Sequence, residues 1–219
     1  MTSSPPNTAH PLKPRLVVLE GPAGVGKTTL QHYLWKKLVE GGISAGRIPE
    51  FSESSLGAAL SNGARYGQSK PDWVTGIGGA LAFLADKIRM LETASRKSEK
   101  LLICDRVITS QLVLSVGQMD TQSGKEVTAK VIYLLLDWIQ DVFSNDSIVV
   151  FLDAPAEVLE KRLQSRLGHP LSRRQTLLLK REIQDYGRLS SSLKGLRSIE
   201  LSSDGPVSEV GQQLMNSVG

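Results

Sequence analysis

The chain has 219 residues, of which 40% are hydrophobic and 22% are charged. This balance is typical of a soluble globular domain, and it excludes a fibre and a largely disordered chain. The longest apolar run has six residues, whereas a membrane-spanning helix needs roughly 20. The length favours one domain, and no internal repeat or linker divides the chain.

The N-terminus and the cysteine content indicate the setting in which the protein works. Residues 1–14 lack the apolar segment of a secretion signal, and we expect them to be a flexible leader before a single domain at 15–219. Cys104 is the only cysteine, so no internal disulfide can form. We therefore expect a reducing, cytoplasmic location and no membrane partner.

The net charge of +4 comes from one segment of the chain. Residues 161–181 hold seven cationic side chains and no acidic ones, and the rest of the chain has a net charge of −3. Such a local cluster favours a site for a small anion over a general nucleic-acid surface, so no nucleic acid is expected as a partner. On charge alone, however, we favour a solvated helix face with long basic side chains over any binding site.

Short apolar segments alternate with longer helical ones along the chain. The segments with strand-like composition are 15–20, 47–50, 101–105, 147–153 and 197–201. Near-continuous apolar runs such as LLIC and IVVFL suit parallel strands that are buried on both faces. The expected helices are 27–40, 72–99, 126–143, 155–167 and 174–190, with a last helix after a turn at 202–206. This alternation predicts a doubly wound α/β fold with a five-stranded parallel sheet flanked by helices.

The strongest signal for function is the segment LVVLEGPAGVGKTTL at residues 16–30. Gly21, Gly26, Lys27 and Thr28 match the spacing GxxxxGK(S/T) of a phosphate-binding loop between a strand and a helix. Glycines let consecutive backbone N–H groups point at one anion, and the helix N-terminus adds positive charge. The alternative is a glycine-rich turn with a chance lysine.

The loop predicts ATP and Mg²⁺ as cofactors, because its lysine can reach the terminal phosphates and the Thr28 hydroxyl can bind Mg²⁺. The residues expected to bind the nucleotide are Gly21, Pro22, Ala23, Gly24, Val25, Gly26, Lys27, Thr28 and Thr29. Asp105 ends the apolar segment LLICD, which is the expected place for a second Mg²⁺ partner. Asp153 ends IVVFLD in the same way, but we interpret it as a strand-end residue with a structural role.

Further short segments behind the phosphate loop carry a resemblance to a known family. They are RIPE at 47–50, FLADKIR at 83–89, the pair Asp105-Arg106, and FLDAPAEVLEKRLQSR with the arginines that follow it. In this order they resemble the thymidylate kinase family of P-loop nucleoside monophosphate kinases. The resemblance implies a P-loop NTPase three-layer fold with a short basic lid at about 166–175. It also implies a homodimer as one assembly to test.

The resemblance implies phosphoryl transfer from ATP to a nucleoside monophosphate. An acceptor phosphate is already anionic, so it needs no general base but does need cations, and arginine forks suit that task. The residues expected to be catalytic are Lys27, Arg47, Asp105, Arg106, Arg166 and Arg173, with Arg174 as another lid candidate. The residues expected to bind the acceptor are Arg47, Glu50, Phe83, Lys87 and Arg106. Phe83 would stack on the base, or else it is a core residue of an apolar helix face.

Three positions depart from the family pattern on the acceptor side. Ala23 stands where the family usually has an acid in the phosphate loop, and Lys87 stands in place of a base-reading arginine. Val107 follows the Asp-Arg pair where the family commonly has tyrosine. A lysine cannot reproduce the planar two-donor contact of an arginine. We therefore expect phosphoryl transfer to be retained and a strict preference for thymidylate to be in doubt.

Two alternatives stay open at this point. The acceptor could be a hydroxyl of a deoxynucleoside or another small metabolite, with Glu50 or Asp105 accepting its proton. The chain could also be a nucleotide-binding protein without kinase activity. The turn at 202–206 could border the donor base, although we prefer a plain turn. The three histidines are too scattered to indicate a metal site.

Overall fold

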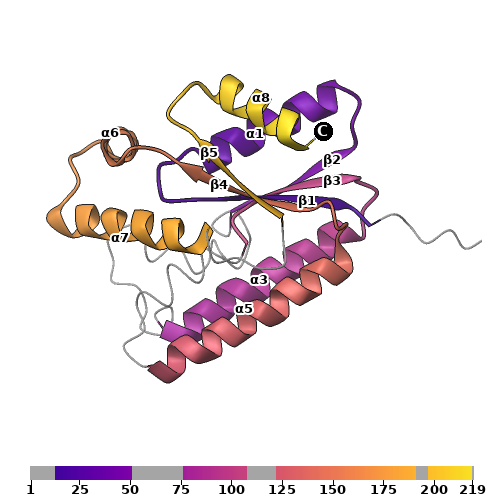
Figure 1. The fold of residues 1–219 in the computed structure, drawn as a ribbon, viewed down its shortest axis with the longest axis horizontal. Coiled ribbons are helices and arrows are strands. Elements are labelled where there is room, and N and C mark those ends of the chain that lie inside the picture. Colours follow the sequence, from indigo (N-terminus) through magenta and orange to yellow (C-terminus); the bar gives the residue numbers. More distant parts are fainter. Residues whose placement is uncertain (1–12, 51–75, 108–121, 191–196, 219) are drawn as a thin grey trace, which may run out of the picture.

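The computed structural model describes residues 13–50, 76–107, 122–190 and 197–218 (Figure 1). Most of the expected leader, residues 1–12, lies outside these ranges. Pro14 is buried, and its carbonyl accepts a hydrogen bond from Ser144 N at 3.0 Å. Among the described residues, no helix is long and apolar enough to cross a membrane.

Strands and helices alternate along the described chain, as expected. The strands are β1 (Arg15–Glu20), β2 (Ala45–Ile48), β3 (Leu101–Asp105), β4 (Ile148–Asp153) and β5 (Arg197–Ser202). The helices are α1 (Lys27–Glu40), α3 (Gly76–Ser95), α5 (Gln122–Val142), α6 (Ala156–Leu167), α7 (Arg173–Ser190) and α8 (Val207–Val218). This order confirms the predicted α/β fold.

The five strands form one sheet in the order β2-β3-β1-β4-β5, and every pair is parallel. Helices α1 and α8 pack together on one face, and α3 and α5 lie side by side on the other (Figure 1). Side chains alternate between these faces: Leu16 and Val18 pack with α3 and α5, whereas Val17 and Leu19 pack with α1 and α8. Burial on both faces explains the continuous apolar runs.

Strand β2 differs from the prediction by two residues. It begins at Ala45 and ends at Ile48, whereas the sequence predicted a strand at 47–50. Ala45 pairs with Leu101 and Ile48 with Cys104. The next residue, Pro49, has no N–H with which to continue the ladder, so the strand ends before it. Glu50 therefore lies beyond the carboxyl end of β2, at the edge where all parallel strands end.

Two predicted helices have bounds that differ from the structure by more than one residue. α3 ends at Ser95 and not at residue 99, and its expected start at 72–75 lies outside the described residues. α5 begins at Gln122, four residues before the predicted start at 126. The predicted lid at 166–175 spans the end of α6, the connection 168–172 and the start of α7. Ser172 and Gln175 exchange hydrogen bonds across the first turn of α7, which is a capping box.

Candidate active site

The phosphate loop connects the carboxyl end of β1 to the first turn of α1. Gly21, Gly24 and Gly26 have φ angles of 142°, 82° and 100°, a range that side chains with a Cβ rarely adopt. At Gly21 a Cβ atom would lie 2.4 Å from the carbonyl oxygen of Leu152 in β4. Glycine is therefore required at position 21, because the backbone angle is unusual and because β4 approaches too closely for a side chain.

Lys27 lies beneath this loop and is buried. Its ammonium donates to the carbonyl oxygens of Gly21 at 2.8 Å and Pro22 at 2.9 Å. The pKa of Lys27 is lowered to about 7, mainly by burial and in smaller part by the positive charge of Arg106. An anion bound in the loop would supply the missing negative charge and favour the ammonium form.

Thr28 and Asp105 form the pair that the sequence predicted for Mg²⁺. The Thr28 hydroxyl donates to Oδ2 of Asp105 at 2.5 Å. Asp105 is fully buried, and its other oxygen, Oδ1, has no hydrogen-bond partner among the described residues. Burial raises the pKa of Asp105, and the hydrogen bond from Thr28 opposes that rise. A hydroxyl beside a buried carboxylate with a spare acceptor fits a hard cation and its water ligands.

Arg106 is surrounded by acidic and hydroxyl groups. Its guanidinium lies 3.4 Å from the Glu50 carboxylate and 3.6 Å from Glu182 of α7, and it donates to the Tyr186 hydroxyl at 3.2 Å. These partners outweigh the effect of burial and raise the pKa of Arg106, so it stays charged. Its φ angle of 59° is the only positive one at a non-glycine position among the described residues. Strained backbone of this kind is often found at functional sites.

Glu20 at the end of β1 holds the backbone beside this arginine. Its carboxylate accepts hydrogen bonds from Val107 N at 2.9 Å and from the Tyr186 hydroxyl at 3.4 Å. Sequence reasoning missed Glu20, Glu182 and Tyr186. Glu20 carries the signal that identified Asp105, an acid that ends an apolar strand, but α7 gives no local sign that it approaches β1.

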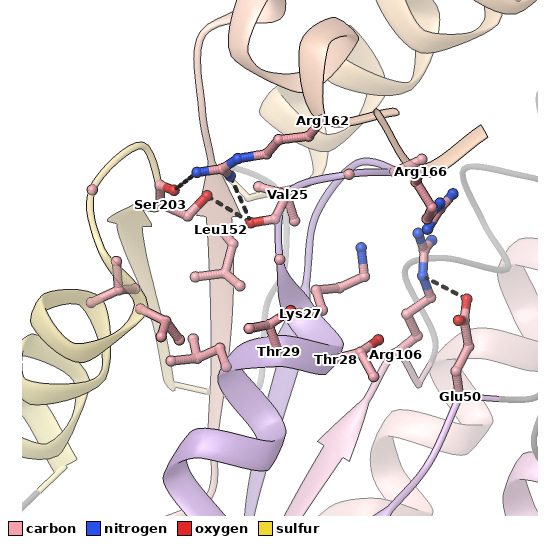
Figure 2. A pocket seen from close by; sticks show the side chains of 17 residues that line it. Val25, Lys27, Thr28, Thr29, Glu50, Arg106, Leu152, Arg162, Arg166 and Ser203 are labelled. Carbon is pink, nitrogen blue, oxygen red and sulfur yellow. Dashed lines mark hydrogen bonds and ion pairs between the residues drawn. The ribbon is translucent and has the colours of Figure 1, made fainter. Parts of the chain in front are cut away.

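Lys27, Thr28 and Arg106 line one cavity of about 800 Å³ at the carboxyl edge of the sheet (Figure 2). The buried Asp105 is not part of its lining. The phosphate loop forms its middle, and Glu50 and Arg106 form one end. Figure 2 shows Ser203 on the opposite side of the loop, with Arg162 beside it. Gly205, Val207 and Val210 also line the cavity. The turn at 202–206 therefore borders the cavity and is not the plain turn that we expected.

The structure brings some predicted site residues to the cavity and places others elsewhere. Arg166 lines it, whereas Arg173 and Arg174 are exposed and are not part of its lining. Arg47 is also outside it: its guanidinium contacts His32 and lies 5.2 Å from the centre of the Trp35 ring, both on α1. The side chain of Phe83 lies outside the described part of the structure.

Lys87 is buried and is not part of the cavity lining. Its ammonium donates to the carbonyl oxygens of Pro49 at 2.8 Å and Asp105 at 3.1 Å, so it joins the ends of β2 and β3. Asp153, in agreement with its structural interpretation, accepts a hydrogen bond from Ala154 N at 2.8 Å. The described residues hold no group of three or more His, Cys, Asp or Glu side chains that could bind a metal by itself.

A parallel sheet in this order, with a phosphate loop after β1 and an acid after β3, places the chain among the P-loop kinases. A solved structure with this fold is that of deoxyadenosine kinase from M. mycoides with the products dCMP and a flexible dCDP bound. The TM-score is 0.63 at 15% sequence identity, over 93% of this chain and 98% of that one. The family model of thymidylate kinase matches residues 19–191, and the chain belongs to this family. Membership supports a nucleotide or nucleoside kinase activity, and the family implies ATP as the phosphate donor.

Proposed function

We propose that the chain transfers the γ-phosphoryl group of Mg-ATP to a nucleoside monophosphate. The observation that carries this proposal is the arrangement of the cavity, which extends from Ser203 past Lys27 to Arg106. A donor nucleoside at the Ser203 end would place its phosphates in the loop, and an acceptor at the Arg106 end would lie in line with them. Catalysis of phosphoryl transfer is mostly such positioning, together with neutralisation of charge.

At the donor end, three sets of groups would bind the nucleotide and neutralise its charge. Backbone N–H groups of the loop and the Lys27 ammonium would bind the phosphates. The Thr28 hydroxyl and the Asp105 carboxylate would hold Mg²⁺, which when bound neutralises charge on the phosphates. Arg166 lines the same cavity and would face the migrating group when the lid closes.

At the acceptor end Arg106 would bind the incoming phosphate. The bond from the γ-phosphorus to the bridging oxygen of ATP breaks, and a bond forms to an oxygen of the acceptor phosphate, so no proton has to be removed. Arg106 would exchange its contact with Glu50 for the acceptor phosphate, because both ligands approach it from the cavity side. Arg47 would contribute only after leaving Trp35.

A second candidate acceptor is a hydroxyl group, as in a deoxynucleoside. The observation that favours it is the Glu50 carboxylate, which lines the cavity with a side chain that is 41% exposed. A hydroxyl must lose a proton when it attacks the phosphorus, and Glu50 could accept it. The deoxyadenosine kinase with the same fold makes such an acceptor worth testing, although the likeness itself shows the fold alone.

Turnover of ATP with paired monophosphates and nucleosides tests the proposal. We expect transfer to at least one monophosphate, without exclusive use of dTMP because of Ala23 and Lys87. Glu50→Gln separates the two candidates: it should leave transfer to a monophosphate within a few-fold of wild type and abolish transfer to a hydroxyl. Transfer to nucleosides alone, lost in Glu50→Gln, would replace the first candidate by the second.

ATP binding without transfer to any acceptor would instead favour the nucleotide-binding protein without kinase activity. We also propose a cytoplasmic location, supported by the single free thiol of Cys104. A homodimer, which the family resemblance implies, is tested by the mass of the protein in solution.

A further inference from the structure

Two side chains from outside the phosphate loop converge on the carbonyl oxygen of Val25. Ser203 Oγ donates to it at 2.8 Å, and Nη1 of Arg162 donates at 3.4 Å (Figure 2). Arg162 belongs to α6, and Ser203 to the connection between β5 and α8. They are 137 and 178 residues away from Val25 in the sequence, so this contact exists only in the folded chain.

Ser203 and Arg162 are themselves held in place. Ser203 is buried, and its backbone N–H donates to the carbonyl of Asp153 at 2.7 Å. Its own carbonyl accepts a hydrogen bond from Nη2 of Arg162 at 2.7 Å. The guanidinium of Arg162 thus bridges the carbonyls of Ser203 and Val25, and it joins α6, the β5–α8 connection and the phosphate loop.

The direction of the Val25 carbonyl determines the direction of the next N–H group. A peptide unit is planar and trans, so its C=O and N–H bonds point to opposite sides. The described chain has no cis peptide bonds. With the Val25 carbonyl turned toward Ser203 and Arg162, the N–H of Gly26 points the other way. Figure 2 shows the Lys27 ammonium on that opposite side, where the phosphates would bind.

Gly26 cannot hold this orientation by itself. Its φ angle is 100°, and no other atom lies within 4 Å of the place where a Cβ would be. A glycine in open space has a wide range of backbone angles. Gly26 is also the N-cap of α1, and no side chain caps that helix by a hydrogen bond. On its carbonyl side, this peptide is restrained by the two donors on Val25.

We propose that Ser203 and Arg162 are positioning residues that orient the Gly26 N–H toward the phosphates of the bound nucleotide. Both also line the end of the cavity that includes Gly205 and Val207. Ser203 and Arg162 would thus lie near the donor nucleoside and would also orient the loop that binds its phosphates. This inference rests on the proposed function for the identity of the anion, but the orientation itself is a property of the free protein.

The proposal is tested by calorimetry, which measures the affinity of wild type and of Ser203→Ala for ATP and for inorganic tripolyphosphate. Tripolyphosphate has no nucleoside, so a residue that only contacts the nucleoside cannot affect its binding. We expect Ser203→Ala to weaken both ligands by about three- to tenfold, the range for loss of one hydrogen bond. Ser203→Thr keeps a hydroxyl and should restore binding. The control is Ser202→Ala, because the neighbouring Ser202 is exposed and its hydroxyl donates to Asp204 at 2.7 Å and not to the phosphate loop.

Weaker ATP binding with unchanged tripolyphosphate binding would overturn the proposal, since Ser203 would then be a nucleoside contact. Unchanged binding of both ligands would overturn it as well. The amide resonance of Gly26 in the ligand-free protein gives a readout that does not need ATP. It should shift and exchange faster in Ser203→Ala but not in Ser202→Ala. A wild-type protein that binds neither ligand would contradict the proposed function, whereas the Gly26 resonance would still decide the positioning role.

Discussion

The hydroxyl of Tyr186 accepts a hydrogen bond from Nη1 of Arg106 at 3.2 Å. The same hydroxyl donates to Oε2 of Glu20 at 3.4 Å. Tyr186 is on α7, the helix that begins within the predicted lid, whereas Arg106 follows β3 and Glu20 ends β1. One buried phenol thus connects the helix after the lid with the acceptor end of the cavity.

Tyr186→Phe should lower turnover by about tenfold, because Arg106 loses one of the groups that orient it. The variant should also lose about 0.5–1.5 kcal/mol of stability, the usual net value of a hydrogen bond. Tyr133→Phe is the matched control, since Tyr133 is 62% exposed on α5. Steady-state kinetics and denaturant unfolding measure both effects. Equal behaviour of the two variants would show that the contact with Arg106 has no role.

ATP binding should take up a proton above neutral pH. The pKa of Lys27 is lowered from 10.5 to about 7, so in the free protein the ammonium deprotonates as pH rises through 7. Bound phosphates favour the ammonium and raise its pKa again, so binding near pH 8 requires a proton from the buffer. Binding enthalpies in buffers of different ionisation enthalpy measure this uptake. It should disappear near pH 6 and in Lys27→Met, and a buffer-independent enthalpy near pH 8 would refute it.

Asp105→Asn should raise the Mg²⁺ concentration needed for half-maximal activity by about tenfold or more. The same substitution should not lower the stability of the fold, although it impairs activity. Burial raises the pKa of Asp105, so its charged form is less favourable in the folded than in the unfolded chain. The stability that this raised pKa contributes is present at low pH and is lost as pH rises through the folded pKa. At neutral pH the Asn variant should therefore unfold at the same temperature as wild type or higher.

Asp153→Asn is the control for this prediction, because Asp153 also ends a parallel strand but contacts Ala154 N. Its Mg²⁺ requirement should match that of wild type. Equal Mg²⁺ requirements of all three proteins would remove Asp105 from the metal site.

Lys87→Met should destabilise the fold and not merely change substrate choice. Removing the ammonium leaves the carbonyls of Pro49 and Asp105 without their buried donor, at about 1–3 kcal/mol for each. Lys36→Met is the control, because that lysine is 72% exposed on α1. Thermal unfolding measures the loss. If Lys87→Met kept wild-type stability but altered the choice of nucleotide base, the base-reading role implied by the family resemblance would be correct.

Local signals in the sequence account for much of the fold and for one end of the site. The bounds of β1, β3 and α1 agree with the prediction, because an apolar run or a helical repeat is interrupted at each end by glycine, proline or charge. The phosphate loop, Asp105 and Arg106 were predicted from residues adjacent to a strand end. The structure places the loop and Arg106 at one cavity, and Asp105 contacts the loop residue Thr28.

Two further site residues come from a helix whose contacts no local pattern reveals. Glu182 and Tyr186 are two polar residues among many on α7, and only its packing against the sheet brings them to Arg106. Arg47 and Lys87 have side chains suited to binding a nucleotide, but neither lines the cavity. Arg47 contacts Trp35 instead, and Lys87 donates to backbone carbonyls.

The sequence by itself determined the class of this protein, because a phosphate loop works through backbone N–H groups and a lysine that are adjacent in the chain. The tertiary structure decided which of the many charged residues face the cavity. A side chain's role depends on which carbonyl, carboxylate or ring it meets after the sheet has assembled. Val25 illustrates this division: the loop motif places its carbonyl, but Ser203 and Arg162, from the last third of the chain, determine where that carbonyl points.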